Sequence, residues 1–544
     1  MTTEEIANAL KLTAQLMELH EENPFKIKSL ANVAYKLDKT DVDLQGMTLS
    51  EIEKIEGVGK GIAAKIDELL VTGNLKELSA LFDRTPLGVI EMLKIKGIGP
   101  KKVGQLWREL EIESIGELLY ACNENRLITL KGFGAKTQEQ VKKQIEFFQL
   151  NIGKFHYAAV EKFAFELVDF LKEKYNTEFV SLTGEMRRKC EVIDKIEILI
   201  ATTSAISIDE IQNHRNVKIE FITCAEIDFY SKLFETTGAE SHFVKLKNPK
   251  SYITLIGVEG LNYGSEIEIY KSLNLQYIEP ELREGLDEVS LAKENRIPKL
   301  IEVSDLRGIL HNHSTYSDGM NSLIEMAEYC KELGYEYLGI CDHSQSAFYA
   351  QGLKPDRVFA QHLEIDELNK KLFPFKIFKG IESDILNDGS LDYSEEVLQS
   401  FDFIVASVHS NLKMSEEKAT TRLLKAIENK YTTILGHPTG RLLLSRPGYP
   451  IDHKKIIDAC AANGVVIELN AHPYRLDIDW RWISYCLDRG VKISINPDAH
   501  ERAGFHDMYF GACVARKGML TKSECFNALT LREIEKYFLD RKGK

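Results

Sequence analysis

The chain has 544 residues, of which 44% are hydrophobic and 28% are charged, and its formal net charge is −14. This length predicts several domains rather than a single core, and the negative charge argues against a protein that coats nucleic acid by bulk attraction. No run of about 18 apolar residues occurs, so we expect no segment to span a membrane.

Cysteine usage and the first residues bear on the compartment. The nine cysteines lie between Cys122 and Cys525 and form no CxxC pair, which is typical of reduced thiols in a cytoplasmic protein. The first ten residues, MTTEEIANAL, are acidic and lack the basic and then apolar pattern of a signal peptide. We therefore expect a cytoplasmic protein.

Residues 1–150 are predicted to form helices joined by short glycine turns. Three segments repeat an apolar residue, a Gly-x-Gly turn and a helix that carries lysine: IEGVGKGIAAKI (55–66), LKIKGIGPKKVGQLW (93–107) and LKGFGAKTQEQV (130–141). Glycine permits the tight turn and a close approach by another backbone, and the amides that open the next helix can hold a phosphate. A single such turn is also plain helix punctuation, whereas three in succession favour phosphate binding.

These segments resemble helix-hairpin-helix motifs, which hold DNA by its backbone without reading the base sequence. The resemblance implies DNA as a partner, and the net negative charge does not exclude such local contacts. It also implies a set of contacting glycines and lysines: Gly57, Gly59, Lys60, Lys65, Gly97, Gly99, Lys101, Lys102, Gly132 and Gly134.

The segment GVGKGIAAKIDELLVTGNLKEL (57–78) resembles the small N-terminal domain of family X DNA polymerases. In members with lyase activity, a lysine of this domain attacks an abasic sugar as a Schiff base. Lys65 occupies the matching position, while Gly61 replaces a lysine often found nearby. The alternative is that Lys65 is only a phosphate contact or a solvated helix residue.

The segment TGEMRRKCEVIDKIEILI (183–200) resembles the palm motif of the same family, a Gly-Ser-x-Arg-Arg turn followed by a strand with Asp-x-Asp. Gly184, Arg187 and Arg188 match this motif. Glu185 replaces the serine that would meet a nucleotide phosphate. The arginine pair is expected either to bind phosphate or to pair with acidic neighbours.

The catalytic carboxylates of the palm are altered. Lys195 and Glu197 stand where the two aspartates belong, and Glu220 stands where the third belongs. Two-metal nucleotidyl transfer needs anionic oxygens between two dications, and a lysine about 4 Å from a unit positive charge is repelled by roughly 4 kcal/mol at an effective dielectric near 20. Asp194 cannot substitute, because side chains alternate along a strand. We therefore predict a palm that acts as a scaffold without polymerase activity.

Two further segments, TTGAESHFVKL (236–246) and YIEPELREG (277–285), resemble the end of the palm and the thumb of bacterial family X polymerases. We therefore expect the polymerase fold to persist around the altered site.

After residue 300, apolar runs alternate with helical stretches. Ten of the fourteen histidines lie in this part. Continuous apolar runs spaced by helices predict a parallel sheet buried on both faces, and seven such units predict a (β/α) barrel with one unit fewer than the common eight. The runs are RGIL (307–310), YLGIC (337–341), FKIFKGI (375–381), FDFIVASV (401–408), TTILG (432–436), GVVIELN (464–470) and VKISIN (491–496).

Each run ends in potential metal ligands or a polar cluster. The ends of barrel strands form one rim, where active sites of this architecture lie. A single histidine after a strand is usually structural, but nine ligand-type residues after six of seven strands predict a polynuclear metal site. These residues, hereafter the rim cluster, are His311, His313, Asp318, His343, Glu382, His409, His437, Asp498 and His500. Imidazole and carboxylate ligands without thiolate suit zinc, manganese or iron.

The order H-x-H, D-H, E, H, H and D-x-H over residues 300–540 resembles the polymerase-and-histidinol-phosphatase (PHP) superfamily. The resemblance implies three divalent metal ions per chain, with manganese as the activating one. His311, His313, Glu382 and Asp498 would hold the first; Glu382, His409 and His437 the second; and Asp318, His343 and His500 the third. His472 lies outside the ligand set.

The catalytic set implied by the same resemblance is His343, Glu382 and Asp498, joined by Arg475. Arg475 would clamp a substrate phosphate, although a buried structural salt bridge is an equally open interpretation. A cluster of this kind suits phosphoester hydrolysis, because divalent metals acidify water and balance charge on the phosphate oxygens.

The expected fold is multidomain, α+β and α/β, with a helix-hairpin-helix N-terminal region, a palm and thumb like those of polymerase β, and a distorted (β/α)7 PHP barrel. The predicted domains are a lyase-like domain (1–85), a fingers-like region (86–150), a degenerate palm (151–235), a thumb-like region with linker (236–300) and a PHP metallophosphoesterase domain (301–544).

Bacterial family X polymerases with a PHP domain share this layout, and members show manganese-dependent 3′→5′ exonuclease activity. The resemblance therefore implies a DNA 3′-end-processing enzyme of DNA repair. Three alternatives are an active family X repair polymerase, a phosphatase of small monoesters such as histidinol phosphate, and a DNA-binding scaffold with a structural cluster. The sequence indicates no membrane contact and no particular protein partner.

Overall fold

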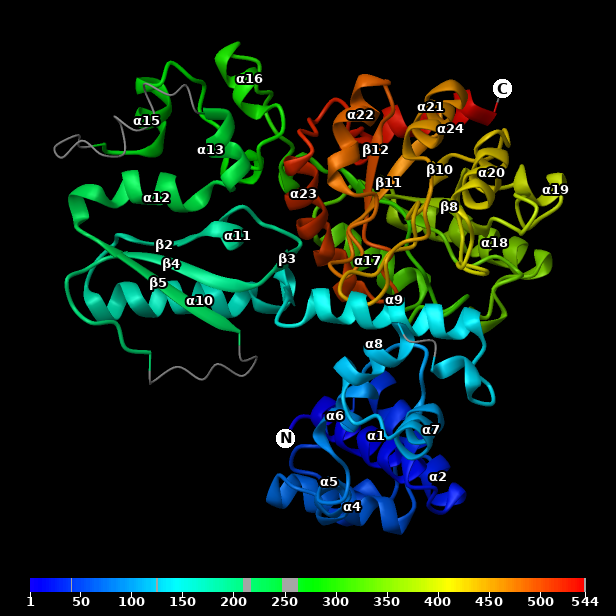
Figure 1. Cartoon of the computed structure of the whole chain (residues 1–544). Helices are drawn as coiled ribbons and strands as arrows, with labels where there is room; N and C mark the ends of the chain where they lie inside the picture. The colour runs from blue at the N-terminus through cyan, green and yellow to red at the C-terminus, as the bar shows by residue number, and fades with distance from the viewer. Residues whose placement is uncertain (41, 124–125, 209–216, 247–262, 543–544) are drawn as a thin grey trace. The chain divides into compact units, whose positions relative to one another are not determined.

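The computed structural model describes residues 1–40, 42–123, 126–208, 217–246 and 263–542. They form two compact units, Met1–Ile152 and Gly153–Lys544; the first runs from blue to cyan in Figure 1. Residues 209–216 of the expected palm and 247–262 of the expected thumb-like region lie outside the described residues. Within the described ranges, every helix is too short or too polar to cross a membrane.

The first unit is helical, as predicted. Its apolar side chains form two clusters, one from Ile6 to Leu81 and one that combines Leu19 with residues from Val89 to Ile145. Its elements are α1 (Thr3–Leu19), α2 (Pro24–Lys39), α3 (Leu49–Ile52), α4 (Lys60–Thr72), α5 (Lys76–Phe82), α6 (Leu87–Met92), α7 (Pro100–Leu110), α8 (Ile115–Asn123), the short helix η1 (Leu127–Thr129) and α9 (Ala135–Asn151).

The three glycine turns share one backbone geometry. Gly57, Gly97 and Gly132 have φ angles of +87°, +92° and +87°, in the left-handed region that glycine adopts without strain. The glycine two residues later is in each case the N-cap of the next helix, α4, α7 or α9, and none of these caps has a side-chain hydrogen bond. The first backbone amides of α4 and α9, and those that follow Pro100 in α7, are therefore available to a ligand.

The second unit begins with a three-stranded sheet, in the order β2 (Val180–Thr183), β4 (Lys195–Ala201) and β5 (Lys218–Cys224). β2 is antiparallel to β4, and β4 is parallel to β5. The sheet packs with α10 (Tyr157–Tyr175), α11 (Gly184–Arg187) and α12 (Phe229–Thr237). A small ladder joins β1 (Phe155–His156) to β3 (Val192–Ile193).

Short helices follow the sheet and lead into the barrel. They are α13 (Glu240–Leu246), α15 (Glu266–Ser272), η3 (Pro280–Leu282), α16 (Glu288–Lys293) and η4 (Val303–Asp305). Their core includes the buried residues Phe234, Tyr270 and Leu282.

The barrel contains seven parallel strands in sequential order, which confirms the predicted architecture. They are β6 (Gly308–Ile309), β7 (Tyr337–Ile340), β8 (Lys376–Asp384), β9 (Phe403–Ser407), β10 (Ile434–Leu435), β11 (Val466–Asn470) and β12 (Ile493–Asn496). A parallel bridge between Asn312 and Ala499 joins the ends of the first and last strands. The connecting helices are α17 (Leu323–Glu332), α18 (Pro355–Leu372), α19 (Glu395–Leu398), α20 (Glu416–Ile427), α21 (His453–Asn463) and α22 (Ile483–Asp488), and α23 (Met508–Lys517) and α24 (Leu531–Lys542) follow β12.

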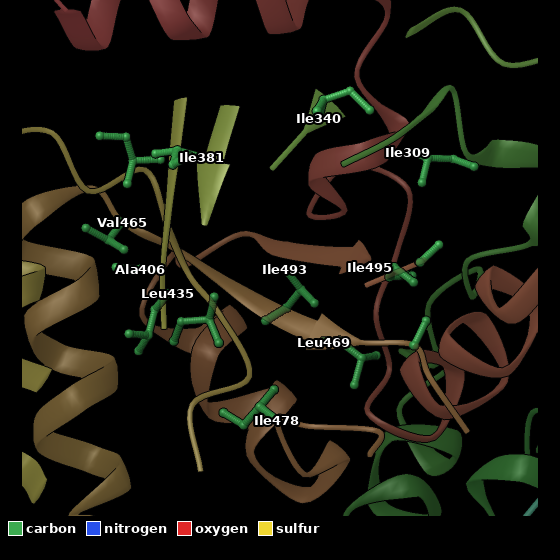
Figure 2. Close-up of a cluster of buried hydrophobic side chains, with 14 of the residues drawn as sticks. Ile309, Ile340, Ile381, Ala406, Leu435, Val465, Leu469, Ile478, Ile493 and Ile495 are labelled. Carbon is green, nitrogen blue, oxygen red and sulfur yellow. The ribbon is translucent and has the colours of Figure 1, made fainter. Parts of the chain in front are cut away.

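Side chains alternate between the two faces of each barrel strand, and this alternation separates two apolar clusters. The larger cluster packs strand residues against the helices; Figure 2 shows its members Ile309, Ile340, Ile381, Ala406, Leu435, Leu469, Ile493 and Ile495, one or more from each strand. A second cluster contains Phe378 and Phe403 together with Phe538 of α24. Because residues two apart share a face of a strand, Phe378, Gly380 and Glu382 point the same way, and Glu382 lies at the rim end of this row.

Candidate metal centre

The nine residues of the rim cluster lie at or just beyond the carboxyl ends of six strands. Glu382 is within β8, and the other eight follow strand ends: His311, His313 and Asp318 follow β6, His343 follows β7, His409 follows β9, His437 follows β10, and Asp498 and His500 follow β12. Gly380, two residues before Glu382 in β8, must be glycine, because a Cβ there would lie 2.6 Å from Ile340 O and from Phe403 Cζ.

Glu382 is the centre of the cluster, and its side chain is only 1% exposed. Five imidazoles place a nitrogen within 3.7 Å of its carboxylate. The distances to Oε1 are 3.0 Å from His437 Nε2, 3.1 Å from His409 Nε2 and 3.2 Å from His311 Nε2, and those to Oε2 are 3.0 Å from His343 Nδ1 and 3.7 Å from His313 Nε2. One buried carboxylate therefore faces five imidazoles from four strand ends.

Three groups within the cluster have the geometry to hold a metal ion, with ligand atoms that lie within 4.8 Å of one another. They are His311, His313, Glu382 and Asp498; His343, Glu382 and His409; and His313, Asp318, His343 and His500. The first group is the set that the sequence indicated for one metal. The second contains His343 where the sequence placed His437, although His437 also contacts Glu382, so the division of ligands among individual metals stays a prediction.

Several buried atoms of the cluster make no hydrogen bond. These atoms include His311 Nε2, His313 Nδ1 and Glu382 Oε2. Such orphaned atoms are rare in folded proteins and call for an explanation. Imidazole nitrogens and carboxylate oxygens that point at one another without hydrogen bonds fit bound divalent cations, and this donor set suits zinc, manganese or iron.

The pKa shifts within the rim cluster favour the binding of cations. Burial alone would lower the pKa of His311, but the carboxylates of Glu468 and Glu382 raise it well above its usual value. Burial also opposes ionisation of Glu382, yet the surrounding histidines hold its pKa well below the usual range. The pKa of His313 is lowered to about 3 by burial and by His500, which leaves a neutral ring able to bind a metal.

The backbone is unusual at two ligands. His311 has φ of +58° and Asp498 has φ of +53°, in a region that non-glycine residues adopt rarely and mostly at functional sites. Asn312 and Ala499, the residues next to them, form the bridge that closes the barrel. The closure thus fixes the two strained residues side by side.

Glu468 was not singled out by the sequence analysis, and it is fully buried in β11. Its Oε2 lies 2.6 Å from His311 Nδ1 and accepts a hydrogen bond from Asn496 at 2.9 Å. Its Oε1 accepts from the backbone amide of His437 at 3.1 Å. Partners of this kind fix the ring orientation and tautomer of a metal-binding histidine. The only signal in the sequence was a charged residue inside the apolar run GVVIELN.

Two aspartates next to predicted ligands play comparable parts. Asp384 Oδ1 lies 2.5 Å from His409 Nδ1. Asp342 is fully buried, and it accepts hydrogen bonds from the backbone amide and hydroxyl of Ser314 and from Ser317. Asp342 thereby holds the start of the loop that carries Asp318. The available signal was their position in the sequence, because Asp384 lies two residues after Glu382 in GIESD and Asp342 directly precedes His343 in CDHS.

Arg475 lies beside the cluster. Its Nε is 3.9 Å from Asp498 Oδ2, and its side chain is 23% exposed. This exposure leaves the guanidinium accessible to a substrate, unlike a fully buried structural pair. His472 accepts a hydrogen bond from the amide of Tyr474 and belongs to none of the three groups.

The altered palm positions form an ion-pair network. Lys195 Nζ lies 2.9 Å from Glu197 Oε1 and also pairs with Glu220, which in turn pairs with Lys218. Hydrogen bonds from Lys195 and Lys218 lower the pKa of Glu220 to about 2. The ammonium of Lys195 therefore lies between the two carboxylates that remain. Asp194 precedes β4 and is 3.9 Å from Lys154.

The arginine pair of the palm contacts acidic neighbours. Arg187 Nη1 donates to Glu266 at 3.1 Å and to Thr237 at 2.6 Å. Arg188 Nε donates to Glu284 at 3.1 Å. The sequence left open whether the arginines bind phosphate or pair with acidic neighbours, and in the structure both arginines pair with carboxylates.

The predicted DNA contacts of the first unit lie mostly on its surface. Gly59, Gly99 and Gly134 have no atom within 4 Å of an added Cβ, and Lys60 and Lys101 are exposed. Gly57, Gly97 and Gly132 form the turns, and Lys102 lies 5.2 Å from the ring of Phe133. Lys65 is only partly exposed and pairs with Glu77, as does Lys26. An acidic partner already holds Lys65, and no role beyond this ion pair is assigned to it by the geometry.

A parallel seven-stranded barrel that gathers imidazoles and carboxylates in this order defines a PHP domain, here joined to a polymerase-like palm. The family model of the PHP domain matches residues 310–472. Models of a helix-hairpin-helix domain and of a SAM-like helix-hairpin-helix tandem match residues 1–75 and 89–146.

The chain is 33% identical to the protein named DNA polymerase/3′-5′ exonuclease PolX of Bacillus subtilis (strain 168), over 99% of both chains. It therefore belongs to the bacterial family X DNA polymerases that carry a C-terminal PHP domain. A probable phosphatase of Acetivibrio thermocellus is 30% identical over 35% of this chain and 78% of its own length. A probable phosphatase of Clostridium novyi is 24% identical over the same shares.

Proposed function

We propose that this protein is a metal-dependent phosphodiesterase that trims DNA from the 3′ end, in repair, and that its palm no longer supports template-directed synthesis. The observation that carries the proposal is the convergence of five imidazoles on the buried carboxylate of Glu382. Membership of a family of DNA-processing enzymes supports DNA as the substrate.

Three metal ions, held by the rim cluster, would supply an acidified water and positive charge at the phosphate oxygens. The residues of the chain would prepare that chemistry. Glu382 would be among the ligands of two of the ions, while Glu468 and Asp384 would keep His311 and His409 oriented through Nδ1. Arg475 would bind a phosphate oxygen of the substrate beside Asp498.

The hairpins of the first unit support DNA binding. Three turns with similar glycine φ angles each precede helix amides that no side chain caps, and Lys60 and Lys101 lie just after two of them. Such contacts hold the phosphate backbone without reading sequence. We propose that the five sequence-defined domains act together, with residues 1–150 as the DNA-binding part.

The loss of polymerase activity is proposed from the palm network. A polymerase palm must hold two dications between carboxylates, and here the Nζ atom of Lys195 pairs with both Glu197 and Glu220. The arginines that would meet a nucleotide are paired with Glu266 and Glu284. Lys195 and Lys218 together balance the charges of the two carboxylates, which leaves little net charge to attract metal ions.

The test is the release of mononucleotides from a 3′-labelled single strand with manganese. The wild-type chain should release them, and His343→Ala should lose at least a hundredfold in rate because it removes a ligand shared by two groups. Failure of the folded, metal-loaded wild-type protein to shorten DNA would contradict the proposal.

A second candidate function is the hydrolysis of small phosphate monoesters, because the two probable phosphatases align with about a third of the chain. Turnover of histidinol phosphate and of an oligonucleotide by the same preparation separates the two. We expect the oligonucleotide to be preferred, since the PHP domain is joined to hairpins that hold DNA.

A further inference from the structure

One exposed aromatic side chain stands at the edge of the rim cluster. Tyr474 is 48% exposed and lies in the loop that follows β11. The next residue, Arg475, places its Nε 3.9 Å from Asp498 Oδ2. At the base of the same loop, Asn470 donates to Asp498 Oδ2 at 3.1 Å and to Asp477 O at 2.5 Å. The loop is therefore anchored to a predicted metal ligand on both sides of Tyr474.

The ring of Tyr474 is held from behind by a residue of the palm. His156, in β1, stacks on it with 4.2 Å between ring centroids and 29° between ring planes. His156 Nε2 donates to Leu443 O at 3.0 Å, and the amide of Leu443 donates to Tyr474 O at 2.7 Å. Ring stacking and two hydrogen bonds thus fix the position of Tyr474. The two residues that hold it, His156 and Leu443, lie more than 280 positions apart in the chain.

A packing role does not account for this arrangement. The hydroxyl of Tyr474 makes no hydrogen bond to any described residue, and about half of the side chain faces solvent. His472 approaches the ring edge-on, with centroids 5.3 Å apart. A rigid, half-open aromatic ring beside a cationic Arg475 combines a flat apolar surface with an anion contact, and a nucleotide presents the same two features.

We propose that Tyr474, backed by His156, is the stacking platform for the nucleobase of the 3′-terminal nucleotide. This inference rests on the proposed nuclease function and deepens it, because it assigns a palm residue to substrate binding at the PHP site. Aromatic stacking accepts any base, so the platform binds the end of the strand without sequence preference.

The test compares two single strands that differ only at the 3′ end, one with a terminal thymidine and one with a terminal tetrahydrofuran abasic residue. The wild-type chain should show about tenfold higher kcat/KM for the strand with the base. In Tyr474→Leu the two values should become equal, through a rise in KM for the base-bearing strand. The abasic strand should be cleaved at an unchanged rate, which serves as the control for folding and metal loading.

Conservative variants separate stacking from other roles. Tyr474→Phe keeps the ring and should retain the tenfold preference. Tyr431→Leu removes a half-buried tyrosine that precedes β10, at the opposite end of the barrel, and should leave the preference unchanged.

His156 is a positioning residue and calls for its own pair of variants. His156→Ala removes the stacked ring and should reduce the preference for the terminal base. His156→Phe keeps a ring against Tyr474 but loses the hydrogen bond to Leu443, and it should restore most of the preference.

The outcomes distinguish this inference from the function on which it rests. If the wild-type chain cleaves both strands and Tyr474→Leu retains the tenfold preference, the platform is wrong while the nuclease stands. Equal cleavage of both strands by the wild-type chain would overturn the platform in the same way. Cleavage of neither strand would overturn both.

Discussion

Two buried glutamates of the barrel, Glu382 in β8 and Glu468 in β11, have different surroundings. Glu382 turns its carboxylate toward five imidazoles, and its Oε2 makes no hydrogen bond. Both oxygens of Glu468 are used by hydrogen bonds, including that with His311 Nδ1. At the residue scale, we interpret Glu382 as a ligand and Glu468 as the group that orients a ligand.

Glu468→Gln tests this distinction. The amide keeps the shape of the side chain but loses the negative charge beside His311, so metal affinity should fall about 10–100-fold while the fold is kept. Metal titration followed by elemental analysis measures the change. Glu533→Gln, a change at an exposed position, provides the matched control, and equal affinity in the two variants would contradict the assigned role.

Asp507 gives a prediction for pH dependence. Burial, with a contribution from Glu501, raises its pKa to about 7 from the usual 3.8. The folded state therefore holds a proton that the unfolded state releases, so this residue lowers stability progressively as pH rises from about 4 to about 7. Relative to Asp507→Asn, the wild-type free energy of unfolding should decline up to pH 7 and then level off. Parallel denaturant titrations between pH 5.5 and 8.5 measure the difference, and a constant offset would refute the assignment.

At the element scale, the strands of the barrel could be predicted from the sequence. The residues that hold other side chains in place, such as Glu468, could not. All seven apolar runs became parallel strands, because a strand buried on both faces reads as a continuous apolar segment. The convergence of the candidate ligands was predictable because they lie at or just after strand ends. Glu468 was missed because a charged residue within such a run has no distinguishing pattern, and the partners of Arg187 and Arg188 lie about 80 to 100 residues away.

α23 provides a test of how the palm and the barrel depend on one another. Lys517 is fully buried, and its Nζ donates to Glu284 Oε1 at 2.5 Å and to Arg188 O at 3.0 Å. Removing one member of a buried pair costs about 3–5 kcal/mol. Lys517→Met should destabilise the second unit by about that much, and adding Glu284→Gln should recover part of the loss. Denaturant unfolding of the two single variants and the double variant measures this double-mutant cycle. Strictly additive changes in the free energy of unfolding would contradict the coupling.

The glycine hairpins make a separate prediction about DNA binding. Lys60 and Lys101 are exposed after the turns, so a double change to alanine should weaken binding equally for unrelated sequences. The slope of log affinity against log salt concentration should decrease by about 2. Fluorescence anisotropy at several salt concentrations measures the slope, with Lys162→Ala, at an exposed position of α10, as the control. An unchanged slope would remove these lysines from the interface.

At the scale of the whole molecule, the chain combines a rim cluster that fits metal ions with a palm in which Lys195 pairs with Glu197 and Glu220. The rim residues could be named from the sequence, which also placed Glu382 in two of the three ligand sets, but the contact of His343 with Glu382 required the structure. The stacking of His156 on Tyr474 was beyond prediction, because the two lie 318 positions apart and neither belongs to a motif.

The most direct test of this account is a single gel with an end-labelled primer on a template, manganese and the full chain, with and without nucleotides. We expect the primer to shorten in both lanes and to remain intact with His343→Ala. Primer lengthening by the wild-type chain that Glu197→Ala abolishes would contradict the account of the palm, and shortening that persists in His343→Ala would contradict the account of the rim cluster.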